Sequence, residues 1–327
     1  MIEDHGQQRG ESYNAPVSIK LKKIEDRFQI VRVLGQGTSG TVYHVKDMHQ
    51  AGREVALKVL SGMVTIDEHA LSRFHDEIKI CCNVHHQNIV QAYELVELQD
   101  CVGYTMELVV GCDLGKLVDQ VKISYSEIDN IMYQLLGGIS ELHRLKIMHR
   151  DIKLENIILR HDGVVKISDL GLIKKLESKG LTKPGILLGT PQYMPPEYIK
   201  SSWFDERSDI YACGVVLYEL LSGTRRMPHL QGVNAVNHLL KTKFTFPPLK
   251  LSKDGAKYLD ILDVALALSP DARFQNAQEM QKLFQKSQTP IKLRNAKLKE
   301  NKILKLIRCL LMISVITLCL FILSAMK

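Results

Sequence analysis

The 327-residue sequence lacks the cysteine patterns that mark a disulfide framework or a zinc site. Its seven cysteines include no pair spaced as Cys-x-x-Cys, and two of them, Cys309 and Cys319, lie in an apolar run near the end of the chain. Disulfide-rich folds and structural zinc modules depend on such spacings. The sequence therefore favours a reducing, cytosolic environment.

The first residues also lack the apolar segment of a secretory signal peptide. Residues 1–16 are polar and rich in Gly, Gln and Glu, so they offer no apolar core for a translocon. We expect residues 1–27 to form a flexible tail. Repeats on the scale of a domain are also missing, while 45% hydrophobic and 24% charged residues are typical of a folded globular chain.

An excess of positive charge is present, but it is confined to one segment. The formal net charge is +7, and residues 286–308 contain eight basic residues and one acid, which accounts for all of it. This block directly precedes residues 309–326, eighteen positions without a charge. A basic block beside an apolar run favours anionic lipid headgroups over nucleic acid, which is the alternative partner.

Residues 309–326 are predicted to be a transmembrane helix, near the short end of the length that spans a bilayer. Residues 303–307 would extend its apolar face if Lys305 and Arg308 direct their charges toward the headgroups. A buried core helix is the alternative. The basic flank predicts a single-pass protein with a C-terminal anchor, a basic juxtamembrane linker at 286–308 and a cytoplasmic domain before it.

Between the two ends, hydrophobic periodicity changes from that of strands to that of helices. Alternating, Val-rich segments predict strands at residues 28–35, 41–46, 54–60, 89–96 and 103–110, with one helix at 66–84. Helical spacing dominates afterwards, at 115–120, 125–145, 208–222, 233–240 and 258–267. The pattern predicts an α+β domain over residues 28–285, with a small β-rich lobe and a larger, mainly α-helical lobe.

A glycine-rich turn joins the first two predicted strands, in the sequence Gly35-Gln36-Gly37-Thr38-Ser39-Gly40-Thr41-Val42. Glycines let the backbone close over phosphates, with amide N–H groups directed at the oxygens. Similar spacing also occurs in dinucleotide-binding turns and in plain hairpins. This turn connects two strands instead of a strand and a helix, which favours a loop that covers phosphates.

Charged residues follow in four further motifs. These are Val55-Ala56-Leu57-Lys58, His149-Arg150-Asp151-Ile152-Lys153-Leu154-Glu155-Asn156, Ser168-Asp169-Leu170-Gly171 and Gly189-Thr190-Pro191-Gln192-Tyr193-Met194-Pro195-Pro196-Glu197. Phosphoryl transfer needs held phosphates, a metal to neutralise their charge and an acceptor hydroxyl beside a base. In type and order the motifs resemble those of the eukaryotic-like (Hanks-type) Ser/Thr protein kinases, of the bacterial membrane-anchored kind, over residues 28–284.

The resemblance implies the bilobal protein-kinase fold and assigns catalytic roles to four residues. Asp151 would accept the proton of the substrate hydroxyl, and Lys153 would neutralise the γ-phosphate. Asn156 and Asp169 would hold Mg²⁺ or Mn²⁺. A lysine at position 153 is what the Ser/Thr-directed branch of the family carries.

The resemblance also places ATP in the cleft between the lobes. Lys58 would bind the α- and β-phosphates and pair with the helix carboxylate Glu77, although singly the two also fit a surface lysine and a solvated acid. The full set implied to contact ATP is Leu34, Gly35, Gly37, Gly40, Val42, Ala56, Lys58, Met106, Glu107, Val109 and Asp113. In this set Met106 borders adenine, Glu107 and Val109 offer backbone contacts, and Asp113 reaches the ribose.

Three structural roles and one substrate-loop role follow from the same resemblance. Thr190 would hydrogen-bond near the catalytic loop, Glu197 would pair with Arg273, and Asp209 would brace the loop. The chain departs from the family pattern at Leu170, Pro195 and Tyr211, where Phe, Ala and Trp are usual. We expect Leu170 to alter inactive conformations and to leave the chemistry intact.

Regulation is predicted in the segment between Gly171 and Gly189, whose only hydroxyl residues are Ser178 and Thr182. Phosphorylated Thr182, with Ser178 second, would pair with Arg150 and order the segment. The alternative is that these hydroxyls serve solvation alone.

The sequence thus predicts a Ser/Thr protein kinase acting at the cytoplasmic membrane face. Its partners would be proteins with Ser or Thr acceptors, membrane lipids and a second copy joined through the helix, with no nucleic acid. A membrane-held pseudokinase scaffold is the alternative, although the chain keeps Lys58, Asp151, Asn156 and Asp169. A small-molecule kinase is a third option, and Lys153 together with Thr190 argues against it.

Overall fold

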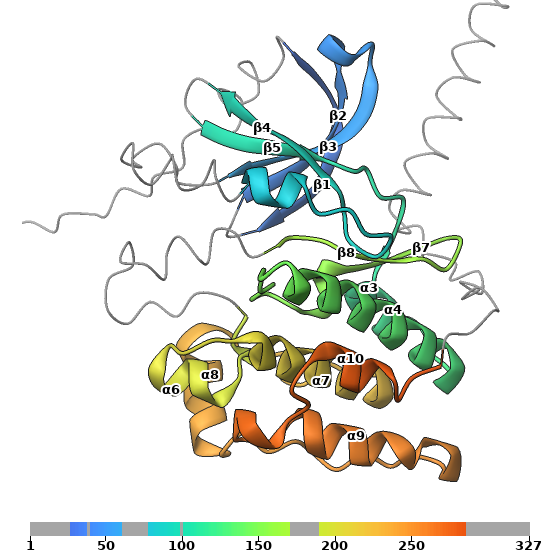
Figure 1. The fold of residues 1–327 in the computed structure, drawn as a ribbon, viewed down its shortest axis with the longest axis vertical. Coiled ribbons are helices and arrows are strands. Elements are labelled where there is room, and N and C mark those ends of the chain that lie inside the picture. Colours follow the sequence, from blue (N-terminus) through green and yellow to red (C-terminus); the bar gives the residue numbers. More distant parts are fainter. Residues whose placement is uncertain (1–26, 38–39, 61–77, 99–100, 171–189, 286–327) are drawn as a thin grey trace, which may run out of the picture.

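The computed structural model describes residues 27–37, 40–60, 78–98, 101–170 and 190–285. Two lobes stack along the long axis, with strands at one end and helices at the other (Figure 1). The predicted basic linker and membrane helix, residues 286–326, lie outside the described ranges. Within those ranges no helix is both long and apolar enough to cross a membrane.

A five-stranded antiparallel sheet forms the smaller lobe, with its strands in the spatial order β1-β2-β3-β5-β4. Because β3 lies at the centre, both of its faces are covered and residues 55–60 are buried without interruption. Apolar clusters pack on the two faces, and residues 78–82 form a helix that contributes Ile78 to one of them. The strands are β1 (Phe28–Gly37), β2 (Gly40–Asp47), β3 (Arg53–Leu60), β4 (Ala92–Leu98) and β5 (Cys101–Met106).

A small three-stranded sheet lies at the junction of the lobes, made of β6 (Gly111–Asp113), β7 (Ile157–Arg160) and β8 (Val165–Ile167). Residues 88–90 run beside β8: Val90 N–H donates to Ile167 O at 2.8 Å, and Ile167 N–H donates to Asn88 O at 2.8 Å. The strand predicted at 89–96 therefore begins only at Ala92. The strand predicted at 103–110 ends at Met106, because residues 107–110 connect the lobes.

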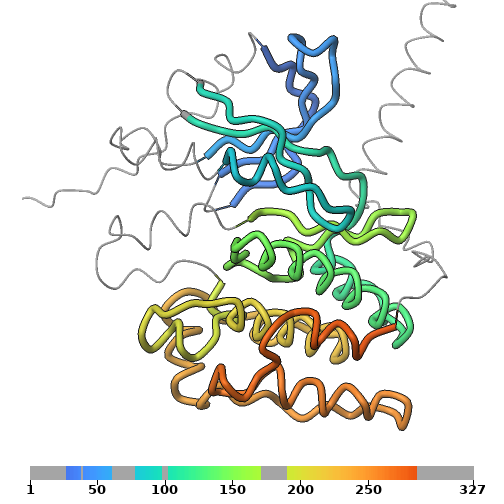
Figure 2. The backbone as a smooth tube through the Cα atoms, in the orientation of Figure 1, coloured from blue at the N-terminus to red at the C-terminus, as the bar shows by residue number. Residues whose placement is uncertain are grey.

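The larger lobe packs around two long helices, α4 and α7, whose side chains form much of its buried core. In Figure 2 the green trace of α4 runs next to the strands of the junction, and the yellow trace of α7 lies below it. At the start of α4, Ser124 N–H donates to the Glu127 carboxylate at 2.8 Å. The Asp205 carboxylate caps α7, and the helix ends at Gly223 with φ of +67°. The helices are α3 (Leu114–Val118), α4 (Tyr125–Arg144), α6 (Pro196–Ser201), α7 (Glu206–Ser222), α8 (Gly232–Lys241), α9 (Lys257–Ala265) and α10 (Ala277–Gln281).

The observed architecture is the predicted α+β arrangement, a β-rich lobe followed by a helical lobe. Of the helix predicted at 66–84, only the part from residue 78 lies in the described ranges, and it ends at 82. The sequence did not predict β6, β7, β8, α6 or α10. Each of these elements has three to six residues, which is too short for a hydrophobic period to show.

Candidate active site at the lobe junction

The motif from His149 to Asn156 forms a loop whose polar side chains converge on one carboxylate. Asn156 Nδ2 donates to the backbone oxygen of Asp151 at 2.8 Å and to its Oδ2 at 3.1 Å. Lys153 Nζ lies 3.0 Å from the same Oδ2 and donates to Thr190 Oγ1 at 3.2 Å. The structure therefore brings together Asp151, Lys153, Asn156 and Thr190, which the sequence had placed in three separate roles.

Asp209 of α7 lies beneath this loop, and only 1% of its surface is exposed. Its carboxylate accepts hydrogen bonds from His149 N–H at 2.8 Å, Arg150 N–H at 2.9 Å and His143 Nε2 at 2.9 Å. Burial alone would raise the pKa of Asp209, but the hydrogen bond from His143 and the nearby charges lower this pKa below its ordinary value. These bonds hold Arg150 in the left-handed region, with φ of +64°.

The β3 lysine reaches the metal-binding motif of the other lobe. Lys58 is 5% exposed, and its Nζ donates to Asp169 Oδ1 at 2.7 Å. Its predicted partner Glu77 lies outside the described residues. Ser168 joins the two motifs, because its N–H and Oγ both donate to Asn156 O, at 2.8 and 3.1 Å. Asn156 and Asp169 are therefore neighbours in space.

These two side chains fit a hard divalent cation. The Asn156 amide nitrogen is bonded to Asp151, so its oxygen is the atom left to face a metal. Lys58 contacts one oxygen of the Asp169 carboxylate. In the described part of the chain no cluster of three or more His, Cys, Asp or Glu side chains is arranged for a metal. A magnesium ion here would therefore rest on two protein oxygens together with substrate phosphates, as Mg²⁺ commonly does.

An apolar cluster adjoins Lys58 on the sheet of the smaller lobe. Val42 is paired with Lys58 across the β2–β3 ladder. Residues predicted to contact adenine share one cluster with it, in which some side chains are buried and others half-buried. A partly exposed apolar wall beside a few polar groups is the usual form of a site for a flat heterocycle. The predicted members of this wall are Leu34, Val42, Ala56, Met106 and Val109.

The glycines of the first turn differ in what surrounds them. At Gly40, φ is +143° and an added Cβ would lie 2.2 Å from Val59 O, so no other residue fits without a backbone shift. Gly35 and Gly37 have no atom within 4 Å of such a Cβ. Gly40 is therefore required for the close approach of β2 to β3, whereas open space adjoins Gly35 and Gly37.

Two predicted nucleotide contacts are also bound within the fold. The Asp113 carboxylate caps α3, accepting from Lys116 N–H at 2.9 Å, and pairs with Lys116 Nζ at 2.7 Å. Glu107 N–H donates to Gln91 O at 2.8 Å, and its carboxylate pairs with the buried Lys166 at 2.7 Å. A backbone contact from Glu107 to a nucleotide would therefore use its carbonyl group.

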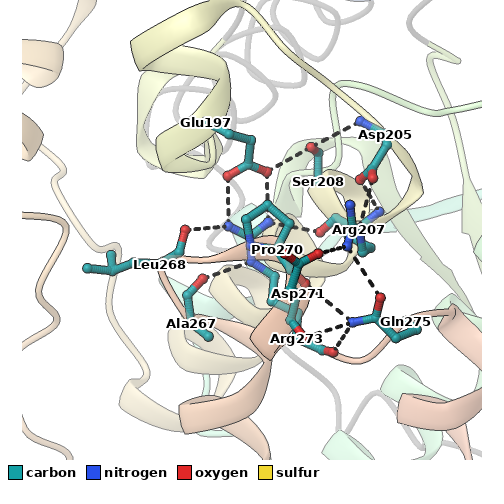
Figure 3. A network of polar contacts seen from close by, with 10 residues as sticks. All are labelled: Glu197, Asp205, Arg207, Ser208, Ala267, Leu268, Pro270, Asp271, Arg273 and Gln275. Carbon is teal, nitrogen blue, oxygen red and sulfur yellow. Dashed lines mark hydrogen bonds and ion pairs between the residues drawn. The ribbon is translucent and has the colours of Figure 1, made fainter.

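The predicted pair of Glu197 and Arg273 is present in the larger lobe (Figure 3). Arg273 donates to both carboxylate oxygens of Glu197 at 2.8 Å, and its side chain is fully buried. Arg273 Nε also donates to Ala267 O at 2.8 Å, and Ser208 Oγ donates to Glu197 at 2.9 Å. The network fixes the end of the Gly189–Glu197 motif to the start of α7.

Of the predicted regulatory residues, Arg150 lies in the described ranges. Arg150 places its guanidinium 5.6 Å from the centre of the Phe204 ring, whereas Ser178 and Thr182 lie outside the described residues. Leu170, where the family usually has Phe, packs against the apolar core of the larger lobe. Tyr211, in place of the usual Trp, is fully buried, and the Arg273 guanidinium lies 4.8 Å from its ring centre.

A cavity of about 300 Å³ opens beside Asp151. Its walls come from the catalytic loop, the Gly189–Glu197 motif and α7, and they include the aromatic rings of Trp203 and Phe204.

Several residues that support the site could not be identified from the sequence. His143 supports Asp209, and Ser168 joins Asn156 to Asp169. Tyr193 Oη donates to the buried Glu219. No motif spacing signals these contacts, because each depends on how distant segments pack.

Comparison with known proteins gives one family. The model described as "Protein kinase domain" matches residues 28–288. The chain is 34% identical to "Serine/threonine-protein kinase PrkC" of Bacillus subtilis over 80% of this chain and 40% of that protein. It is 31% identical to "Serine/threonine-protein kinases PknA" of Corynebacterium glutamicum, over 77% of this chain and 54% of that protein.

A eukaryotic relative is similar to the same degree. The chain is 32% identical to "Aurora kinase" of Yarrowia lipolytica, over 76% of this chain and 66% of that protein. The chain spans about half the length of the curated bacterial relatives it matches.

Proposed function

The chain belongs to the protein kinase domain family, and we propose that it is a Ser/Thr protein kinase that transfers the γ-phosphoryl group of ATP to protein hydroxyls. The observation that carries this proposal is the convergence on Asp151. Its carboxylate contacts Asn156 and Lys153, and Lys153 contacts Thr190. Through Ser168 the same loop adjoins Asp169, which bonds Lys58.

In the proposed reaction the acceptor hydroxyl oxygen forms a bond to the γ-phosphorus while the bond to the β–γ bridging oxygen breaks. The hydroxyl proton passes to the Asp151 carboxylate, and ADP leaves. Lys58 holds the α- and β-phosphates, and Lys153 stabilises charge on the γ-phosphoryl oxygens. Mg²⁺ or Mn²⁺, when bound by Asn156 and Asp169, supplies charge neutralisation at the phosphates.

Selectivity for Ser and Thr acceptors is supported by the bond between Lys153 Nζ and Thr190 Oγ1, 3.2 Å long. This bond fixes the start of the Gly189–Glu197 motif close to the base. The three relatives named above carry a Ser/Thr or Aurora kinase name, in agreement with the proposal.

Transfer of radiolabelled phosphate from ATP to a generic protein substrate tests the role of Asp151. We expect Asp151→Asn to lower kcat by about 10²–10⁴-fold, the usual contribution of a positioned base, and to leave Mg²⁺-dependent ATP binding measurable. Asp162→Asn is the matched control, since Asp162 is a half-exposed acid in the turn after β7. Asp151→Asn protein with wild-type turnover would contradict the proposal.

The pseudokinase scaffold is the other outcome of this experiment. It would show as wild-type protein that binds ATP with Mg²⁺ yet transfers no phosphate to any protein substrate tested. The intact set of Lys58, Asp151, Asn156 and Asp169 favours the enzyme.

We further propose that residues 309–326 anchor the protein in a membrane with the kinase domain on the cytoplasmic face. The support is the uncharged run itself and the basic block at 286–308, which would contact anionic lipids. The anchored chain should stay in the membrane pellet through high-salt extraction and move to the soluble fraction when residues 309–326 are deleted. Full-length protein released by salt alone would contradict the anchor.

Two proposals concern regulation. The membrane helix would join two copies of the chain. Sedimentation in detergent can compare the oligomeric state of the full chain with that of the form without residues 309–326.

Thr182, with Ser178 second, would be autophosphorylated and pair with Arg150. Mass spectrometry of active protein showing both hydroxyls unmodified would overturn the second proposal.

A further inference from the structure

One guanidinium, that of Arg225, is surrounded by acidic and phenolic side chains of the larger lobe. Its Nη2 donates to Glu155 Oε1 at 2.6 Å, and its Nη1 donates to Tyr193 Oη at 3.1 Å. Glu219 Oε2 lies 3.8 Å from Nη1, and Asp119 Oδ1 lies 3.9 Å from Nε. Three carboxylates from separate segments therefore share a single positive charge.

This cluster adjoins the catalytic loop. Glu155 immediately precedes Asn156, which bonds Asp151, and 47% of the Glu155 side chain is exposed. An extended polypeptide covers about 3.3 Å per residue, so a substrate with its hydroxyl at Asp151 passes Glu155 within a few residues of the acceptor. If the substrate residue that faces Glu155 is Lys or Arg, its cation meets a Glu155 carboxylate that is already paired with Arg225.

The position of Arg225 is built into the fold. An added Cβ at Gly115, near the start of α3, would lie 2.4 Å from Arg225 Nη2, so the absence of a side chain there makes room for the guanidinium. The other end of the cluster is anchored by Glu219, which is almost fully buried and accepts from Arg226 N–H at 2.8 Å. Only 21% of the Arg225 side chain is exposed. The guanidinium is thus a fixed group and not a freely moving surface charge.

We propose that Arg225 is a specificity-determining residue, because its guanidinium occupies the acidic subsite beside the catalytic loop and prevents the kinase from selecting substrates with Lys or Arg facing Glu155. The inference rests on the proposed function and names a substrate class for it, sequences without a basic residue at that position. A substrate cation would gain no free carboxylate there and would meet the like charge of Arg225. Removal of Arg225 would leave the exposed carboxylates of Glu155 and Asp119 without their cation, while Glu219 stays buried and accepts from Arg226 N–H and Tyr193 Oη.

The test is a peptide series phosphorylated by the full-length protein, in which Arg replaces Ala at one position at a time on both sides of the acceptor. The quantity compared is kcat/KM for each Arg peptide divided by kcat/KM for the Ala peptide. For wild type we expect this ratio to be about one or less at every position. In Arg225→Ala the ratio should rise about two- to fivefold at one or two adjacent positions, the scale of a partly exposed ion pair. Arg225→Lys, which keeps the charge, should retain the wild-type ratios.

The double variant Arg225→Ala/Glu155→Gln identifies the acid responsible. The new preference for Arg should fall back toward one, because the exposed carboxylate has gone. A purely structural role for Arg225 would lower the thermal stability and kcat/KM for all peptides alike and leave the ratios flat, which would overturn the proposal. A wild-type enzyme that already prefers Arg peptides would overturn it as well.

A second variant keeps the proposal testable if Arg225→Ala does not fold. Glu155→Gln removes a half-exposed carboxylate and leaves Arg225 with less negative charge around it. In the same scan with Asp or Glu in place of Ala, we then expect a gain of about two- to fivefold over wild type at one or two adjacent positions, and no gain at any position would contradict the proposal. Wild type that phosphorylates no peptide or protein would count against the proposed function instead.

Discussion

At the level of single side chains, the pair of Glu197 and Arg273 has a direct energetic consequence. Arg273→Met leaves the Glu197 carboxylate buried without its cation, so we expect the free energy of unfolding to fall by about 3–5 kcal/mol. Denaturant unfolding measures the change. Lys146→Gln is the matched control, because Lys146 is 84% exposed and pairs with Glu206 at 3.3 Å, and its loss should cost about 0–1 kcal/mol.

The buried carboxylate of Asp209 should make the stability of the protein depend on pH. Its pKa is lowered in the folded protein, so its contribution to stability is complete above the pKa of the unfolded chain and is lost as pH falls through the folded value. Stability measured from pH 7 down to pH 3 should therefore decline, in part because Asp209 becomes protonated. In Asp209→Asn, stability at pH 7 should be lower and the acid decline shallower. An unchanged acid decline would contradict this assignment.

At the level of elements, the turn between β1 and β2 separates structural from functional glycines. Gly40→Ala forces a Cβ against Val59 O and a positive φ on a residue that resists it, so stability should fall by more than about 1 kcal/mol. Gly35→Ala and Gly37→Ala meet no atom and should leave thermal unfolding nearly unchanged while raising the KM for ATP. Thermal unfolding of the three variants measures the change in stability, and ATP titration of their activity measures the change in KM.

The sequence predicted the long elements and the motif residues better than the connections among them. Strands β1 to β3 and helices α4 and α7 each have eight residues or more, and their predicted bounds differ from the observed ones by a few residues. The sheet of β6, β7 and β8 could not be predicted, since its strands have three or four residues. His143 and Arg225 could not be predicted either, because their partners lie 66 and 70 residues away.

At the scale of the whole molecule, the bond between Lys58 and Asp169 links the two lobes across the site. A nucleotide with its metal that binds only the folded protein stabilises it by about 2.7 kcal/mol at one hundred times its Kd. Thermal unfolding of wild type should therefore shift upward with ATP and Mg²⁺, and EDTA should reduce the shift. We expect the shift to shrink in Lys58→Met and Asp169→Asn, whereas a full shift in both variants would place the nucleotide elsewhere.

A consequence for control of the enzyme follows from Asp209, which binds two successive backbone amides, those of His149 and Arg150, with one carboxylate. The conformational entropy of the catalytic loop is therefore lost when the chain folds and not when nucleotide arrives. An effector shifts only an equilibrium between arrangements that it binds with different affinity, and these two bonds favour a single arrangement of the loop. We therefore expect signals that change the activity to act on the separation of the lobes or on access to Asp151, and not on the shape of this loop.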